Sequence, residues 1–121
     1  MLGEDQLAAL ELAQRWRFTG RIYDWLGERN PDFFAEMADA QISHWLYSSL
    51  EAGLGWELVT ERALAMWIEA CVDYGQDFAT RPQSPYQRWL SLDAGNAGLA
   101  PELRIRAFEL HSRTHKEVAH D

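Results

Sequence analysis

The sequence has one cysteine in 121 residues and few basic residues. Cys71 has no second cysteine to pair with, so no disulfide framework can form within the chain, and we expect a reducing setting. Lys and Arg number 11 against 19 Asp and Glu, which gives a formal net charge of -8 at pH 7. Nucleic acid is therefore not an expected partner, because phosphate-binding surfaces need clustered Lys and Arg.

Long apolar runs and a basic leader are also missing. No stretch approaches the roughly 20 apolar residues that cross a bilayer, and the first six residues, MLGEDQ, are acidic where a secretory signal is basic. We therefore expect a cytoplasmic protein with no membrane partner. Hydrophobic residues make up 47% of the chain, which is enough for a core, and the length predicts a single domain over residues 1–121.

The motifs of common catalytic and cofactor sites are absent as well. The sequence contains no GxSxG elbow, Walker loop or dinucleotide fingerprint. His111 and His115 lie four residues apart on a predicted helix, but no Glu lies between them as in HExxH, and histidine near a helix C-terminus also interacts favourably with the dipole. We predict no enzymatic activity, no catalytic residue, no cofactor, no metal ion and no small-molecule substrate.

Apolar residues recur at three- and four-residue spacing through most of the chain, which predicts an all-α fold. A first helix is expected over residues 5–27, and Gly20 is the point at which it could kink or divide. Asn30 and Pro31 have the pattern of an N-cap followed by proline at the first helical position. A second helix is therefore expected from Pro31 to about Ala52.

A third helix, expected from Thr60 to Gly75, is predicted to be the central element of the fold. Thr60 is its expected N-cap and Gly75 its C-terminal stop. We expect Phe78 to fold back against this helix, and Asp77 to bond backbone N–H groups in the turn that follows it. The apolar stripe of this helix consists of Leu64, Trp67, Ile68, Cys71 and Val72.

Two further helices complete an expected bundle of about five. Ser84 is the predicted cap of a short helix from Pro85 through Leu92, and the segment DAGNAG is expected to connect it to a last helix that begins at Pro101. The face expected to be lined by apolar side chains on that last helix consists of Leu103, Ala107 and Leu110. The residues expected to face water there are Arg104, Arg106, Arg113 and Lys116.

The distribution of aromatic residues predicts a protein-binding surface. Six tryptophans are spread over every predicted element except the last, and a small domain buries most such rings in its core. The first two helices carry aromatic residues on more than one face, and a helix cannot bury two faces against a single neighbour. Because tryptophan and tyrosine are enriched at binding hot spots, we predict a binding surface that consists of Trp16, Phe18, Tyr23, Phe33 and Tyr47.

One part of the chain, residues 42–92, carries a series of motifs in a recognisable order. They are a turn with Leu54, Gly55 and Trp56, the pair Glu61 and Arg62, a G-x-D-F element with Gly75, Asp77 and Phe78, a loop with Pro82 and Pro85, and a last element with Trp89 and Leu90. This order resembles small helical proteins encoded in effector loci of bacterial type VI secretion systems.

The resemblance implies an accessory role beside an adaptor chaperone that loads a toxin onto the VgrG or PAAR spike. The partner expected on this basis is the adaptor chaperone or its toxin cargo. An immunity protein that binds and neutralises a cognate toxin is the alternative from the same setting, and a small metal-dependent enzyme is a third class. An immunity protein needs its acidic residues on one concave face, whereas the sequence disperses them over all the predicted helices.

Overall fold

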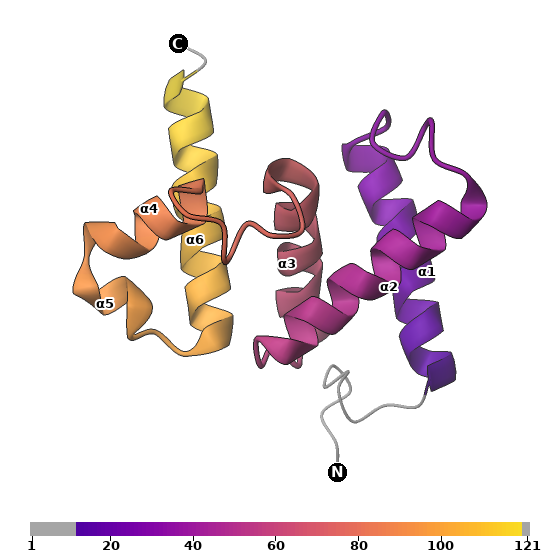
Figure 1. Ribbon diagram of the computed structural model, residues 1–121, viewed down its shortest axis with the longest axis horizontal. Coiled ribbons are helices and arrows are strands. Elements are labelled where there is room, and N and C mark those ends of the chain that lie inside the picture. The colour runs from indigo at the N-terminus through magenta and orange to yellow at the C-terminus, as the bar shows by residue number, and fades with distance from the viewer. Residues whose placement is uncertain (1–11, 120–121) are drawn as a thin grey trace. The chain divides into compact units, whose positions relative to one another are not determined.

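The computed structural model describes residues 12–119, with side chains for residues 14–114. Within these residues six helices form, and the predicted all-α fold is confirmed (Figure 1). The helices are α1 (Leu12–Arg29), α2 (Asp39–Gly55), α3 (Glu61–Tyr74), α4 (Pro85–Leu92), α5 (Ala94–Ala97) and α6 (Pro101–Ala119). The chain divides into two compact units between Glu69 and Ala70, and the single domain over residues 1–121 stays a prediction.

In the first unit, α1 and α2 cross and pack against each other (Figure 1). The helix does not divide at Gly20, because α1 continues through this residue and ends at Arg29. Residues 5–11, where the helix was expected to begin, lie outside the described residues. The side chains that the two helices bury in this core are Phe18, Ile22, Leu26, Leu46 and Leu50.

The second helix begins later than the sequence predicts. Residues 31–36 form turns, and α2 begins only after Ala38, whose backbone N–H donates to Oε1 of Gln41 at 2.8 Å. The turns bury Phe34, which meets the ring of Trp45 edge to face with 5.7 Å between ring centroids. Burial of this ring and the alternative cap outweigh the asparagine-proline pattern that predicted an earlier start.

The third helix begins and ends close to the predicted positions. Oγ1 of Thr60 accepts a hydrogen bond from the backbone N–H of Ala63 at 3.2 Å. Gly75 follows the helix with φ of 95°, the left-handed conformation that favours glycine. Within the first unit, Nε1 of Trp67 donates to the carbonyl oxygen of Ser49 at 3.1 Å, so the buried indole has a polar partner. Four of the five predicted stripe residues are buried, namely Leu64, Trp67, Ile68 and Cys71.

Gly53 permits close approach between α2 and the first part of α3. A Cβ atom at this position would lie 2.8 Å from Cδ2 of Leu64 and 3.0 Å from Cδ1 of Trp67. Carbon atoms in contact are normally about 3.5–4.0 Å apart. Glycine is therefore needed here for packing, and its position on the buried side of α2 explains why the two helices fit together.

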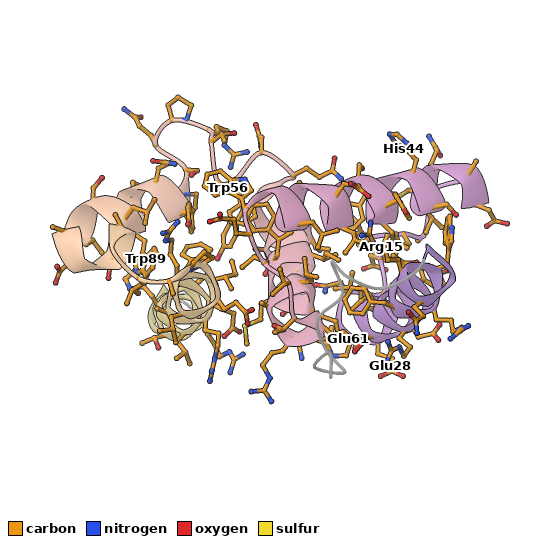
Figure 2. The ribbon with its side chains drawn as sticks, turned by 90° about the horizontal axis from the view of Figure 1, so that it is seen from below. Arg15, Glu28, His44, Trp56, Glu61 and Trp89 are labelled. Atoms are coloured by element: carbon orange, nitrogen blue, oxygen red, sulfur yellow. The ribbon has the colours of Figure 1, made fainter. Side chains whose placement is uncertain are left out.

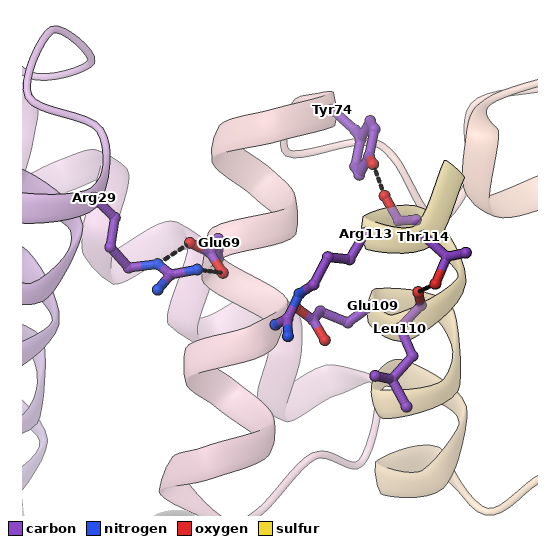
Figure 3. Close-up of polar contacts among 8 residues, drawn as sticks. Arg29, Glu69, Tyr74, Glu109, Leu110, Arg113 and Thr114 are labelled. Carbon is purple, nitrogen blue, oxygen red and sulfur yellow. Dashed lines mark hydrogen bonds and ion pairs between the residues drawn. The ribbon is translucent and has the colours of Figure 1, made fainter. Parts of the chain in front are cut away.

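Two ion pairs also join α1 to α3. Nη2 of Arg21 lies 2.5 Å from Oε1 of Glu61. Nε of Arg29 lies 2.5 Å from Oε2 of Glu69, as Figure 3 shows. Both arginines are more than 40% exposed, and ion pairs at such exposure contribute about 0–1 kcal/mol. These two pairs therefore add little to the stability of the first unit.

The second unit is built around a cluster of aromatic rings. Phe108 contacts three other buried rings, with centroid distances of 6.1 Å to Phe78, 5.0 Å to Tyr86 and 5.6 Å to Trp89. Contacts of this kind add about 0.5–1.5 kcal/mol each beyond the burial of area. Phe78 is fully buried, and its ring partners Tyr86 and Phe108 come from α4 and α6, so its predicted packing against α3 stays a prediction.

The turn after α3 is held by an arginine, which the sequence did not predict. Oδ1 of Asp77 accepts a hydrogen bond from Nη1 of Arg81 at 2.7 Å, so the partner that the structure shows for this carboxylate is a side chain, whereas the sequence predicted backbone N–H groups. Nη2 of Arg81 donates to the carbonyl oxygen of Tyr74 at 2.9 Å. A flexible guanidinium thus reaches both the carboxylate and a carbonyl oxygen in the last turn of the helix.

The start of α4 is confirmed, and the segment after it forms one more short helix. Oγ of Ser84 accepts a hydrogen bond from the backbone N–H of Gln87 at 3.1 Å. The segment expected to be a connection contains the four-residue α5, because Oδ1 of Asp93 accepts from the backbone N–H of Gly95 at 2.8 Å. Both helices lie beside α6 (Figure 1).

The buried face of α6 differs from the predicted one. Ile105 and Phe108 are buried, whereas Leu103 is 54% and Leu110 58% exposed. The predicted apolar face is therefore wrong, because Phe108 joins the aromatic cluster and so turns the two leucines outward. The side chain of Lys116 lies outside the described ones.

Arg104, expected to face water, is partly buried and bonds the chain that precedes α6. Its Nη2 atom donates to the carbonyl oxygens of Ala97 at 3.2 Å and Leu99 at 2.9 Å. The same guanidinium lies beside the hydroxyl of Tyr86. Burial raises the pKa of that hydroxyl, while Arg104 acts in the opposite direction and lowers it. The expectation for Arg104 is wrong because α5 and its loop, unforeseen from the sequence, supply acceptors.

Candidate protein-binding groove

A groove runs between α1 and α2 in the first unit. It consists of two hollows, of about 650 and 270 Å³, which adjoin because they share Tyr23, Asp39 and Ile42. Each helix lines it with residues three or four apart, so each contributes one continuous face. Along α1 these residues include Trp16, Gly20, Tyr23, Asp24, Gly27 and Glu28, and along α2 they are Asp39, Ile42, Ser43 and Leu46.

Two glycines keep the α1 side of the groove open. A Cβ atom on Gly20 or Gly27 would meet no atom within 4 Å, and neither residue has the positive φ that would require glycine. Each glycine destabilises the helix by about 1 kcal/mol relative to alanine. Neither packing nor backbone conformation in the described chain explains them, and their effect is to leave room beside α1.

Trp16 and Tyr23 form the aromatic rim of the groove. Trp16 is 48% exposed and Tyr23 is 40% exposed. The ring of Trp16 lies 5.3 Å from that of Tyr47, and the ring of Tyr23 lies 5.2 Å from that of Phe34. Each ring is thus supported on one side and open on another, so little side-chain freedom remains to be lost when a partner binds.

The other predicted surface residues lie deeper. Phe18 is 3% exposed and belongs to the buried stripe of α1, so its predicted exposure is wrong. Phe33 and Tyr47 are half-buried. The ring of Phe33 lies 4.8 Å from that of Trp45. Of the five predicted residues, two lie on the rim, two pack among the aromatic side chains behind it, and Phe18 belongs to the core.

The charged residues that line the groove are all acidic. Asp24, Glu28 and Asp39 line the larger hollow, and no Lys or Arg lines either hollow. Asp24 and Glu28 lie one turn apart on α1, a spacing at which like charges repel. Glu28 is also in the last turn of that helix, where the dipole disfavours a negative charge. The sequence indicated dispersed acidic residues, and the structure gathers three of them on one concave surface.

The sequence interpretation missed the acidic and glycine residues of the groove. The available signal was the spacing of Trp16, Gly20, Tyr23 and Gly27, which places all four on one face of an unbroken helix. The sequence analysis placed a possible kink or division at Gly20, so this continuous face was not recognised. Asp39 and Ile42 could not be assigned to the groove from the sequence, because only the packing of α2 beside α1 brings them near Tyr23.

The described side chains offer no clear chemistry for a metal ion. Among them, no group of three or more His, Cys, Asp or Glu residues could hold one. The side chain of His115 lies outside the described ones, so the predicted absence of a metal at His111 and His115 stays a prediction. His44 is exposed and points away from α1 (Figure 2), and Cys71 is buried within α3.

Comparison of the chain with protein-family models, curated proteins and solved structures gave no match. The resemblance to type VI secretion accessory proteins over residues 42–92 therefore stays a prediction. Among the helices of the described residues, none has the length and apolar character required to cross a membrane.

Proposed function

We propose that this chain is a non-catalytic protein-binding factor and that the groove between α1 and α2 is its binding site. The observation that carries the proposal is the pair of exposed rings, Trp16 and Tyr23, beside an open surface lined by two glycines. Tryptophan and tyrosine supply much of the energy at protein interfaces, particularly beside a concave surface. Both rings are held by other aromatic side chains and are therefore ordered before a partner arrives.

The finer proposal is a cytoplasmic role in loading a type VI secretion effector, as a co-adaptor beside the adaptor chaperone. It is supported by the order of motifs in residues 42–92, which resembles that of accessory proteins from effector loci. In this role the groove would hold a segment of the adaptor chaperone or of its toxin cargo. No catalytic step by this chain is needed, because loading depends on binding alone.

Most of the motifs that carry the resemblance are structural elements in this fold. Phe78 lies in the aromatic cluster, Asp77 pairs with Arg81, and Trp89 is buried. The groove is formed mainly by residues that precede the resembling segment. The binding site and the secretion role therefore rest on separate observations and require separate tests.

The test is affinity capture from the native cell with the wild type and the variant Trp16→Ala/Tyr23→Ala. We expect the wild type to enrich an adaptor chaperone or a toxin, and the variant to bind it at least about 30-fold more weakly, which corresponds to roughly 2 kcal/mol. Trp56→Ala is the matched control, because Trp56 is exposed but does not line the groove (Figure 2). Phe18 is not substituted, since its loss would open a cavity in the core.

Two outcomes would contradict the proposal in different ways. Equal capture by the wild type and the Trp16→Ala/Tyr23→Ala variant would exclude the groove as the binding site. Capture of neither an adaptor chaperone nor a toxin by the wild type would exclude the secretion role. Circular dichroism of both variants provides the check that the helical fold is intact.

An immunity protein is the second candidate function, and the observation that favours it is the acidic groove. Asp24, Glu28 and Asp39 lie on one concave surface, which suits occlusion of a basic toxin site. An immunity protein would restore growth of cells that express the toxin without any secretion system. A co-adaptor would restore no growth, and its deletion would instead stop delivery of the toxin.

A further inference from the structure

We propose that the segment that binds in the groove is an amphipathic helix of the partner, with Lys or Arg beside a single row of apolar side chains. The inference rests on the proposed function, because it names the partner segment that occupies the same groove. It follows from the dimensions of the groove, from its apolar wall and from the sign of its charge.

The dimensions suit a helix of about three turns. The lining residues of α1 extend from Trp16 to Glu28, a distance of about 18 Å at ~1.5 Å per residue. Ile42 and Leu46 form the apolar wall on α2. Small residues such as Gly20 allow a second helix to come close, as in the helix-in-groove mode of recognition.

The charge of the groove selects a basic segment. The three charged lining residues are Asp24, Glu28 and Asp39, and no lining residue is basic. Within the described chain neither Asp24 nor Glu28 forms an ion pair. Residues 1–11 of this chain contain three acidic residues and no Lys or Arg, so charge argues against that segment as the occupant. A partner helix flanked by Lys or Arg would complement all three carboxylates.

The acidic residues on α1 oppose the stability of the helix that carries them. Asp24 and Glu28 repel each other at their spacing of four residues, and Glu28 lies at the negative end of the helix dipole. A residue that served only to stabilise the fold would not combine these two destabilising effects. Replacing Glu28 is therefore expected to raise the stability of the free protein while it weakens binding, and a purely structural role would not give these opposite signs.

The experiment selects binders from a displayed library of alanine-based helices with no natural sequence. One row of positions varies among apolar residues, and the flanking positions vary between Lys and Glu. We expect selection on the wild-type protein to enrich Lys on the flanks. Enrichment of Glu, absence of any preference, or failure to select any helix would overturn the inference.

The selected peptide is then labelled, and its affinity is measured by fluorescence anisotropy against two matched variants. We expect Glu28→Gln to weaken binding about fivefold at low salt, with the difference shrinking at high salt, and to leave the melting temperature equal or higher. Glu57→Gln makes the same chemical change at an exposed residue outside the groove, and it should leave the affinity unchanged. Equal weakening by both variants would mean that net charge alone attracts the peptide.

A shortened chain that lacks residues 1–11 tests the competing occupant. If that segment fills the groove, its removal should raise the affinity for the peptide about tenfold or more, which would overturn the inference. Failure of the peptide experiments with loss of capture by Trp16→Ala/Tyr23→Ala would leave the groove as a binding site with an occupant of another kind. Failure of the capture experiment alone would instead remove the proposed secretion role.

Discussion

The hydroxyl of Tyr86 lies within the aromatic cluster of the second unit, where its ionised form would lose most of its hydration. Burial raises the pKa of this group above its ordinary value of 10.0, and the guanidinium of Arg104 offsets part of the effect. Because desolvation is the larger of the two causes, the folded protein favours the neutral hydroxyl more than the unfolded chain does.

We expect the free energy of unfolding to fall as the pH rises above about 10. The pKa of Tyr86 is higher in the folded than in the unfolded state, so its contribution is complete below the unfolded value and is lost as the pH rises through the folded value. The slope is at most about 1.4 kcal/mol per pH unit. Denaturant unfolding at a series of alkaline pH values measures it, and Tyr86→Phe with an unchanged pH dependence would assign the effect to other groups.

Single residues could be predicted from the sequence where a local rule decides their role. Thr60 and Ser84 cap helices because their hydroxyls reach backbone N–H groups three residues away. Gly75 adopts the left-handed conformation for an equally local reason. The environments of Phe18 and Arg104 could not be predicted in this way, since they depend on neighbours brought close only by folding.

At the scale of a helix, α1 and α2 place glycine in opposite environments. On α1, Gly20 and Gly27 face open space, whereas Gly53 on α2 lies against Leu64 and Trp67. Helix propensity opposes glycine at all three positions. Packing therefore decides whether each substitution by alanine raises or lowers the free energy of unfolding.

We expect Gly20→Ala and Gly27→Ala each to raise the free energy of unfolding by about 0.5–1 kcal/mol. Gly53→Ala should lower it by about 1–3 kcal/mol, because the new methyl group overlaps two buried side chains. Urea unfolding of the three variants makes the comparison with one chemical change throughout. Stabilisation by Gly53→Ala would show that α2 can move away from α3 at no cost.

The helices themselves were largely predictable, but the buried face of α6 was not. Its apolar residues satisfy two stripes at helical spacing, one through Leu103 and Leu110 and the other through Ile105 and Phe108. The spacing of apolar residues alone is compatible with burial of either stripe. Only the aromatic cluster, assembled from three separate segments, selects the second one, and that cluster is a property of tertiary structure.

At the scale of the whole molecule, the boundary between the two compact units lies at an unusual place. It falls between Glu69 and Ala70, inside α3, where Ile68 and Ala70 are buried. Domain boundaries normally fall in exposed linkers with few contacts. We therefore expect the chain to unfold as one cooperative unit, in line with the single domain predicted from its length.

The test uses one large core residue from each unit. Trp67→Ala and Phe108→Ala should each lower the free energy of unfolding by about 3–5 kcal/mol, because each leaves a cavity among buried side chains. Each variant should melt in one transition, shifted downward by roughly 10 °C or more. Scanning calorimetry that shows two transitions, with only one shifted by each variant, would assign the units to separate domains.

Because Cys71 is buried, the rate at which its thiol is modified reports how often the folded chain opens. Alkylating reagents react with a thiolate that reaches water, and this sole thiol is 2% exposed. Its modification must therefore follow local or global opening, at a rate set by the fraction of molecules that are open. A partner that binds only the folded chain lowers the fraction that is globally open, so alkylation that follows global opening should slow by the factor that the partner's concentration and affinity dictate. Mass spectrometry of the timed reaction would then measure binding on the unmodified sequence, without an attached dye.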